Sequence, residues 1–118
     1  MEIEKDFHFE AAHYLPFVPE QHKCHRVHGH SYVATIGAKG PLTPDGWVID
    51  FADVSAAAAG ILGELDHRLL NDVAGLQNPT AELLAMWIYE RMEPILSGLS
   101  FVTVCETATA RCTYRGPA

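Results

Sequence analysis

The sequence predicts a single α+β domain in which two helices cover one face of a four-stranded antiparallel sheet. Three observations support this prediction: strand-like segments near the N-terminus, two helical segments in the middle of the chain, and two more strand-like segments at its end. The order strand, strand, helix, helix, strand, strand within residues 1–118 is typical of one α+β domain. We expect both helices to lie on the same side of the sheet.

The first two strands are predicted at residues 3–12 and 28–39. In the first strand, Phe7 and Phe9 recur with period two, which is typical of a strand with one buried face, and His13 continues that face. The second strand is rich in aromatic and β-branched residues, which favour the extended conformation. The prolines between the two segments predict a connecting loop.

Two helices are expected after a turn at residues 40–46, which is rich in glycine and proline. Residues 47–49 are expected to extend or cap the sheet before the first helix. An alanine-rich helix is predicted at residues 52–65. The second helix is predicted to open with Asn78 as its N-cap and Pro79 in its first turn, because both residue types are favoured at those positions.

Pro94 is expected to kink or shorten the second helix, because proline lacks a backbone N–H. Residues 99–107 and 110–114 then predict a β-hairpin that closes the domain. This hairpin supplies the third and fourth strands of the expected sheet.

The composition is that of a globular protein with an acidic surface. Hydrophobic residues make up 48% of the chain, and the mean hydropathy is +0.03. Fifteen acidic residues against eight lysines and arginines give a net charge of −7, which argues against nucleic-acid binding. No apolar run approaches the ~20 residues of a membrane span, so we expect neither a membrane partner nor a signal peptide. Three cysteines, an odd number, favour a reducing compartment, and we expect a cytoplasmic protein.

Three histidines form the most informative pattern of the chain. His28 and His30 are two residues apart on a predicted strand, so their imidazoles point to the same side. Together with His13 they can offer three nitrogen ligands to one ion. Zinc binds neutral imidazole, and three protein ligands with an open fourth position are typical of a catalytic zinc site. Cys24 lies just upstream and can act as a nucleophile or a base beside that metal.

Several short motifs follow one another in a specific order and spacing. They are Phe7–His13, His22–Cys24, His28–Ser31, Trp47–Phe51, Leu65–His67, Leu70–Asp72, Asn78–Thr80, Glu106–Thr107 and Tyr114–Gly116. In this combination the chain resembles the 6-pyruvoyltetrahydropterin synthase family over nearly its whole length. The three residues between Cys24 and His28 match the bacterial branch, the 6-carboxytetrahydropterin synthases of the queuosine pathway, whereas the eukaryotic branch has a longer loop there. His25 departs from that branch, which often has a small or different residue at this position.

The resemblance implies a tunnelling fold, in which the sheets of several protomers join edge to edge into a barrel. It implies a homo-oligomer, expected as a hexamer built as a dimer of trimers, with active sites at subunit interfaces. A small antiparallel sheet has open edges, which such an assembly covers. The implied reaction is the zinc-dependent conversion of 7,8-dihydroneopterin triphosphate to 6-carboxy-5,6,7,8-tetrahydropterin, with release of triphosphate and acetaldehyde. This lyase reaction needs no redox cofactor.

The resemblance also assigns roles around the metal. His13, His28 and His30 match the zinc ligands of the family, and the zinc is expected to act as a Lewis acid on substrate hydroxyls. Cys24 matches the catalytic cysteine, which acts as a base in its thiolate form. The alternatives for Cys24 are a fourth zinc ligand or an inert loop cysteine.

Three acidic and imidazole side chains complete the implied catalytic set. Asp66 and His67 match a pair in which the aspartate orients the imidazole and the imidazole moves a proton. The alternative is a histidine at the C-terminal end of a helix, favoured by the helix dipole. Glu106 matches the residue that anchors the pterin ring by accepting two hydrogen bonds from it, and the alternative is a glutamate that reaches water.

Further contacts to the substrate are also expected. Thr80 and Thr107 are expected to contact the pterin. Two of five basic residues are expected to hold the triphosphate, because most charged residues on a protein are simply solvated. This set contains Lys23, His25, Arg26, Arg111 and Arg115.

Two other functions stay open. The first is formation of the pyruvoyl product from the same substrate without cleavage of the side chain, which product analysis distinguishes. The second is a non-catalytic module that binds zinc or pterin, which would lack Cys24 or His67, and both are present. A zinc hydrolase has less support, because the glutamate of an H-E-x-x-H motif is absent.

Overall fold

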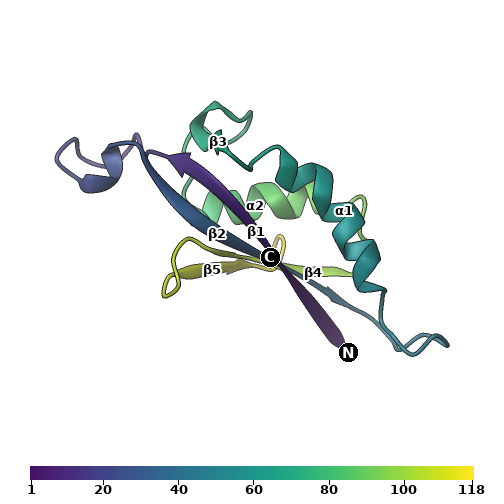
Figure 1. The fold of residues 1–118 in the computed structure, drawn as a ribbon. Coiled ribbons are helices and arrows are strands. Elements are labelled where there is room, and N and C mark those ends of the chain that lie inside the picture. Colours follow the sequence, from purple (N-terminus) through teal and green to yellow (C-terminus); the bar gives the residue numbers. More distant parts are fainter.

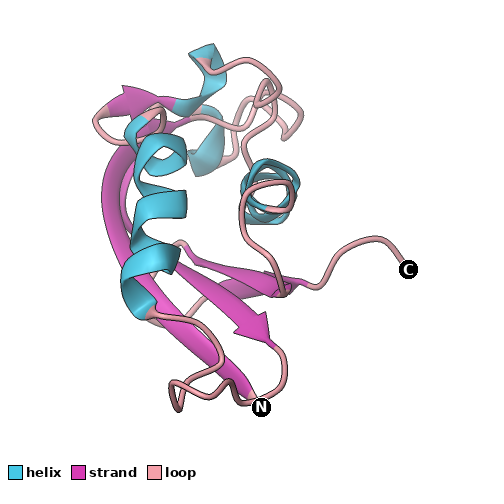
Figure 2. Ribbon diagram, turned by 90° about the vertical axis from the view of Figure 1, so that its right-hand side faces the viewer, coloured by secondary structure: helices cyan, strands magenta, loops and turns pink.

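The computed structural model describes residues 1–118, which form a five-stranded sheet with two helices (Figure 1). The elements are β1 Glu2–His13, β2 His28–Lys39, α1 Phe51–Gly63, β3 Arg68–Leu69, α2 Ala81–Met92, β4 Leu99–Cys105 and β5 Arg111–Tyr114, with 3-10 turns at Lys23–His25 and Leu70–Asp72. The strand order is β3-β1-β2-β4-β5. Both helices lie on the same side of the curved sheet (Figure 2), which confirms the predicted α+β class.

The ladder between β1 and β2 determines where the histidines lie. These strands pair in antiparallel register without interruption, from Glu2 opposite Lys39 to His13 opposite His28. Residues directly opposite each other in such a ladder project from the same face of the sheet. The two histidines therefore leave the sheet side by side, at the end of the ladder remote from the N-terminus.

The sheet has one more strand than predicted. β3 contains only Arg68 and Leu69 and pairs in parallel with Ala11 and Ala12 of β1. The other four strands are antiparallel, as expected. A strand of two residues is too short to produce a hydrophobic period, so the sequence pattern gave no sign of it.

α1 begins one residue before its predicted start and ends two residues before its predicted end. The Asp50 carboxylate caps it by accepting the N–H of Ala52 at 2.9 Å. Residues 47–49 do not extend the sheet, contrary to expectation. The Thr43 N–H donates to the Trp47 carbonyl at 2.9 Å and closes a turn, so this stretch connects the turn to the helix cap.

The N-cap of α2 is Thr80, so the predicted Asn78 cap was wrong. The Thr80 hydroxyl accepts a backbone N–H of the first turn at 3.1 Å. Pro79 precedes the helix, and its carbonyl accepts a hydrogen bond from His13. Asparagine and threonine are both good caps, so local preference could not choose between them. The helix ends at Met92, before Pro94, which agrees with the prediction that this proline shortens it.

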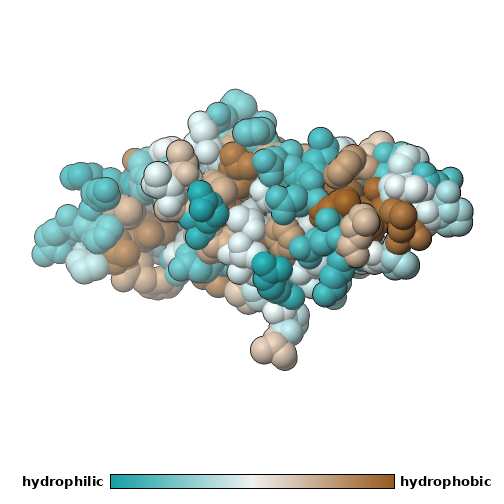
Figure 3. Space-filling view, turned by 90° about the horizontal axis from the view of Figure 1, so that it is seen from below, coloured by the Kyte–Doolittle hydropathy of each residue, from teal (hydrophilic) through white to brown (hydrophobic).

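The hydrophobic core fills the space between the sheet and the two helices. Its fully buried side chains come from every layer, and the largest are Tyr32, Ile36, Val54, Leu65, Leu70, Leu76, Leu84, Ile88, Met92, Val102 and Val104. The opposite face of the sheet carries no helix and presents both polar and apolar side chains (Figure 3). No helix in the structure has the length and apolar character that crossing a bilayer requires.

The shape of the chain is elongated and its sheet has open edges. The molecule measures 56 × 27 × 25 Å, and its radius of gyration is 15.1 Å. A compact domain of this length is expected to have a radius of gyration of about 13.5 Å. β5 ends the strand order on one side, and β3 covers only two residues of β1 on the other. Such edges can pair with strands of another chain.

Candidate metal centre and active site

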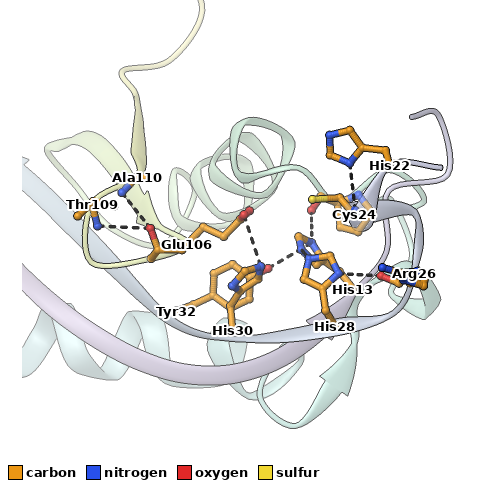
Figure 4. Close-up of polar contacts among 12 residues, drawn as sticks. His13, His22, Cys24, Arg26, His28, His30, Tyr32, Glu106, Thr109 and Ala110 are labelled. Atoms are coloured by element: carbon orange, nitrogen blue, oxygen red, sulfur yellow. Dashed lines mark hydrogen bonds and ion pairs between the residues drawn. The ribbon is translucent and has the colours of Figure 1, made fainter. Parts of the chain in front are cut away.

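His13, His28 and His30 converge at one end of the β1–β2 ladder (Figure 4). The ring centroid of His13 lies 4.6 Å from that of His28 and 5.1 Å from that of His30. The ring centroids of His28 and His30 are 4.9 Å apart. One nitrogen from each ring lies within 4.8 Å of the others, which allows one metal ion to be held by all three. The predicted spatial triad is therefore present.

Backbone carbonyls select the tautomer of two of these histidines. His13 Nδ1 lies 2.8 Å from the Pro79 carbonyl, and His28 Nδ1 lies 2.7 Å from the Arg26 carbonyl. A carbonyl can only accept, so both Nδ1 atoms carry hydrogen and both Nε2 atoms keep a lone pair for a ligand. The two Nε2 atoms lie 3.0 Å apart. A cation or a shared proton is needed to make that approach favourable.

The third ring and the charges around it agree with a metal site. His30 Nε2 is buried without a hydrogen-bond partner, and the nearest acid, Glu106 Oε1, is 3.5 Å away. Burial lowers the pKa of His13 and of His30, so both imidazoles favour the neutral form that binds metals. Three neutral imidazoles suit zinc, copper, iron or nickel, and they leave further coordination positions open.

A hollow of about 330 Å³ lies beside the triad. It is lined by residues from the loop, β2 and the end of β4, namely Lys23, Cys24, His28, His30, Glu106 and Thr107. This volume lies within the range of small-molecule sites. The structure thus brings six predicted site residues together around one cavity.

Cys24 belongs to the 3-10 turn Lys23–His25 and is half-buried. Its backbone N–H donates to His22 Nδ1 at 3.0 Å, and its carbonyl accepts the N–H of Leu15 at 2.8 Å. The group of potential metal ligands contains the three histidines and does not include this cysteine. The arrangement favours a thiol that lies next to the metal position over a fourth ligand.

Glu106 lies immediately after β4, where its side chain turns toward the histidines (Figure 4). Its backbone N–H donates to the Ala110 carbonyl at 3.1 Å, which closes the β4–β5 connection. The Thr107 hydroxyl accepts the N–H groups of Thr109 and Ala110 at 3.3 and 3.1 Å, so it shapes the same connection. The predicted pterin anchor therefore lies beside the histidines of its own chain.

Asp66 and His67 form a close pair, but they lie outside this cavity. Asp66 Oδ2 is 3.0 Å from His67 Nδ1, and Asp66 Oδ1 accepts the N–H of Glu10 at 2.9 Å. These hydrogen bonds, that from Glu10 first, lower the pKa of Asp66 and keep it ionised. His67 adopts a left-handed φ of 58°, which is uncommon outside glycine, and its side chain is 79% exposed.

His67, without Asp66, lines a different hollow, together with Glu10, Ser31, Arg68 and, from the triad, His30. Glu10 alternates with His13 along β1 and is paired with Ser31, so the side chains of Glu10 and Ser31 project from the face of the sheet opposite to the histidine rings. Asp66 and His67 therefore do not line the cavity beside the triad of their own chain. Their catalytic role stays a prediction.

The other residues predicted to contact the substrate lie in different parts of the structure. Thr80 caps α2, and its pterin contact stays a prediction. His25 is half-buried with Nδ1 unpartnered, whereas Arg26 is exposed and bonds the triad only through its carbonyl. The Arg111 guanidinium donates to the Ala108 carbonyl at 3.3 Å. The guanidinium group of Arg115 lies 5.2 Å from the ring centre of Phe101.

Sequence reasoning missed the residues that support the ligands. Tyr32 is 1% exposed, and its hydroxyl lies 3.2 Å from His13 Nδ1, next to the bond to Pro79. Its position two residues after His30 placed it on the same face, which was the available signal. The role of Pro79 depends on a contact across 66 positions of the chain, which no local pattern reveals.

Comparison with known proteins agrees with this geometry. The chain matches the family model described as 6-pyruvoyl tetrahydropterin synthase over residues 2–117. It is 41% identical over 122 residues to the 6-carboxy-5,6,7,8-tetrahydropterin synthase of Synechocystis sp., which covers 98% of this chain and 93% of that protein. The protein of the same name from Bacillus subtilis is 33% identical over 127 residues, covering 97% of this chain and 84% of that protein.

A solved structure agrees as well. The 6-pyruvoyl tetrahydropterin synthase of Caenorhabditis elegans superposes with a TM-score of 0.91 at 29% identity, over 99% of this chain and 96% of that one. The resemblance seen in the sequence motifs is thus confirmed over almost every residue. The chain belongs to the 6-pyruvoyl tetrahydropterin synthase family.

Proposed function

We propose that this protein is a zinc-dependent lyase on the pathway to queuosine. It forms 6-carboxy-5,6,7,8-tetrahydropterin from 7,8-dihydroneopterin triphosphate and one water, releasing triphosphate and acetaldehyde. The observation that carries the proposal is the convergence of three imidazoles beside Cys24 and Glu106 in one cavity. Two relatives with the name of this synthase support the same reaction. The three-residue spacing between Cys24 and His28 favours the carboxy product over the pyruvoyl product.

Zinc is the metal that we assign to His13, His28 and His30. Their donor set of three neutral nitrogens with open positions is that of catalytic zinc sites. When bound, zinc supplies Lewis acidity toward the hydroxyls of the substrate side chain and acidifies the neighbouring C–H bond. The hydrogen bonds to Pro79 and Arg26 hold two of the rings in the tautomer that this binding requires.

Cys24 is the base that removes a proton from the substrate side chain. A thiol acts as a base in its thiolate form, which nearby positive charge favours. Lys23 lines the same cavity and would supply such charge, as would a metal bound to the triad. The two backbone hydrogen bonds of Cys24 keep the thiol at the cavity wall.

Glu106 holds the pterin ring. Its carboxylate can accept hydrogen bonds from the 2-amino group and from the adjacent ring N–H, which is a two-point fit. Glu106 Oε1 lies 3.5 Å from His30 Nε2, so a ring bound to this carboxylate lies close to the metal ligands. The side chain of the pterin can then reach both the metal position and Cys24.

Asp66 and His67 complete the site from a neighbouring protomer. Within one chain they do not line the cavity beside the triad, so a second chain must bring them to the substrate. The open edges at β1 and β5 and the elongated shape support an edge-to-edge assembly, which we propose is a hexamer built as a dimer of trimers. In that position His67 moves a proton while Asp66 holds its imidazole.

The decisive test incubates the zinc-loaded protein with 7,8-dihydroneopterin triphosphate and analyses the pterins by mass spectrometry. We expect 6-carboxytetrahydropterin, together with acetaldehyde and triphosphate in equal amounts. A pyruvoyl product with no acetaldehyde identifies the pyruvoyl activity instead. Unchanged substrate with protein that holds one zinc per chain contradicts both activities.

A further inference from the structure

His22 has no part in the proposed chemistry, yet it contacts the backbone of the proposed base directly. The residue precedes the 3-10 turn Lys23–His25, and its side chain is the N-cap of that turn. The N–H of Cys24 donates to His22 Nδ1 at 3.0 Å (Figure 4). A ring nitrogen accepts a hydrogen bond through its lone pair, so Nδ1 of His22 serves as the acceptor of this bond.

The loop that carries Cys24 is anchored firmly at its other side. The side chain of Asn71 accepts the N–H of Tyr14 at 3.0 Å and donates to the Tyr14 carbonyl at 2.8 Å. The next residue, Leu15, donates its N–H to the Cys24 carbonyl at 2.8 Å. The carbonyl side of Cys24 is therefore linked to the end of β1, and the N–H side is linked to His22.

Most residues around the turn are exposed, so few apolar contacts fix its shape. The side chain of Phe17 is 80% exposed and that of Val27 63%. Gln21, His22 and Lys23 are exposed as well. Hydrogen bonds to side chains and backbone therefore determine the conformation of the turn, and a missing cap is expected to loosen it.

We propose that His22 is a positioning residue, which holds the Cys24 thiol at the wall of the metal cavity through the hydrogen bond between the Cys24 N–H and His22 Nδ1. The inference rests on the proposed role of Cys24 as the base, but the hydrogen bond itself does not. A thiol displaced by about 1 Å from a reacting C–H is a poor base, so the effect of His22 falls on turnover and not on binding.

The test compares three substitutions of His22. His22→Ala removes the acceptor. His22→Asn places an amide oxygen at nearly the same distance from the backbone as Nδ1, and asparagine is among the best N-caps. His22→Gln moves its oxygen one bond farther away. Gln21→Ala, an exposed neighbour in the same loop, is the matched control.

For His22→Ala we expect kcat to fall by about tenfold with KM and zinc content unchanged, which corresponds to 1.36 kcal/mol. His22→Asn is expected to restore most of kcat, whereas His22→Gln is not. Alkylation of Cys24 by iodoacetamide, followed on its own peptide, is expected to accelerate several-fold in His22→Ala and to stay at the wild-type rate in His22→Asn. Gln21→Ala is expected to match wild type in both measurements.

Equal alkylation rates in wild type and His22→Ala contradict the inference, as does a His22→Asn variant that behaves like His22→Ala. The alkylation measurement needs no substrate. If alkylation changes as expected while no variant and no wild-type sample turns over the pterin, the proposed function fails and the role of His22 in holding Cys24 stands.

Discussion

The metal triad and the Asp66–His67 pair differ in how completely one chain builds them. The triad lies at the end of a long antiparallel ladder, with one ring fully buried and two rings bonded to backbone carbonyls. The pair lies in an exposed turn outside the cavity beside the triad, and its histidine has a left-handed backbone. A non-glycine residue with positive φ is uncommon, and such backbone conformations cluster at functional sites, which agrees with the proposed role of the pair.

This difference separates the cavity beside the triad from the Asp66–His67 pair within one chain. One chain brings together the proposed base, the proposed pterin anchor and two of the three proposed metal ligands, because Cys24, Glu106, His28 and His30 line one cavity. Asp66 and His67 do not line that cavity. If the proposed function holds, assembly is a condition for turnover but not for metal binding, and the predictions below test each half.

The largest effect is expected from loss of a metal ligand. His28→Ala removes one of three nitrogens, so we expect both the zinc content and the turnover to fall to background. Elemental analysis of the purified protein measures the metal, and wild type is expected to contain about one zinc per chain. His8→Ala, at an exposed position of β1, is the control. Full activity in metal-free protein contradicts the role of the metal.

Cys24→Ala tests the base without disturbing the ligands. We expect turnover to fall by ~100-fold or more, the usual effect of losing a positioned acid–base group. Zinc content and pterin binding are expected to stay at wild-type values, because the thiol lies outside the ligand set. Loss of zinc together with the thiol means that Cys24 is a ligand, and the proposed mechanism then fails.

Glu106→Gln tests whether the Glu106 carboxylate holds the pterin ring. The substitution keeps the shape but turns one acceptor oxygen into a donor, which then faces the donors of the pterin. We expect pterin binding to weaken by ~1–3 kcal/mol, the cost of an unpaired polar group. Calorimetric titration with a pterin analogue measures this change. Affinity equal to that of wild type removes Glu106 from the site.

The smallest effect concerns pH and the buried rings of the metal-free protein. Burial lowers the pKa of His13 and His30 from the ordinary 6.5, so the unfolded chain binds these protons more readily than the folded chain. Their contribution to stability is therefore present above pH 6.5 and is lost as the pH falls below it. We expect the Tm of metal-free protein to decrease over that range. A Tm that rises on acidification contradicts the assignment.

The sequence pattern was sufficient to predict the triad, because the direction of each of its side chains follows from the alternation of residues along a strand. Period two placed His28 and His30 on one face, and the continuation of the first strand brought His13 to the same face. The pairing of two adjacent strands then required only a short connection. The fold class followed from the same periodicities, since each long element has a clear pattern.

The sequence pattern failed where contacts between distant parts of the chain determine the local structure. The carbonyl of Pro79 accepts a hydrogen bond from His13, and the N-cap of the helix follows at Thr80, although Asn78 was at least as good a cap by local preference. The placement of Asp66 depends on its bond to Glu10, across 56 positions of the chain. No spacing in the sequence carries that information, so the motif identified the pair without locating it.

The most direct test of a shared active site mixes two inactive variants. Cys24→Ala and His67→Ala are each expected to be inactive alone, because each removes one group from every site. When the two are unfolded together and refolded into mixed assemblies, verified by native mass spectrometry, some sites combine an intact Cys24 from one chain with an intact His67 from its neighbour. We predict that formation of the carboxypterin returns in the mixture. Mixed assemblies that stay inactive, while wild type refolded in the same way recovers its turnover, contradict the shared site.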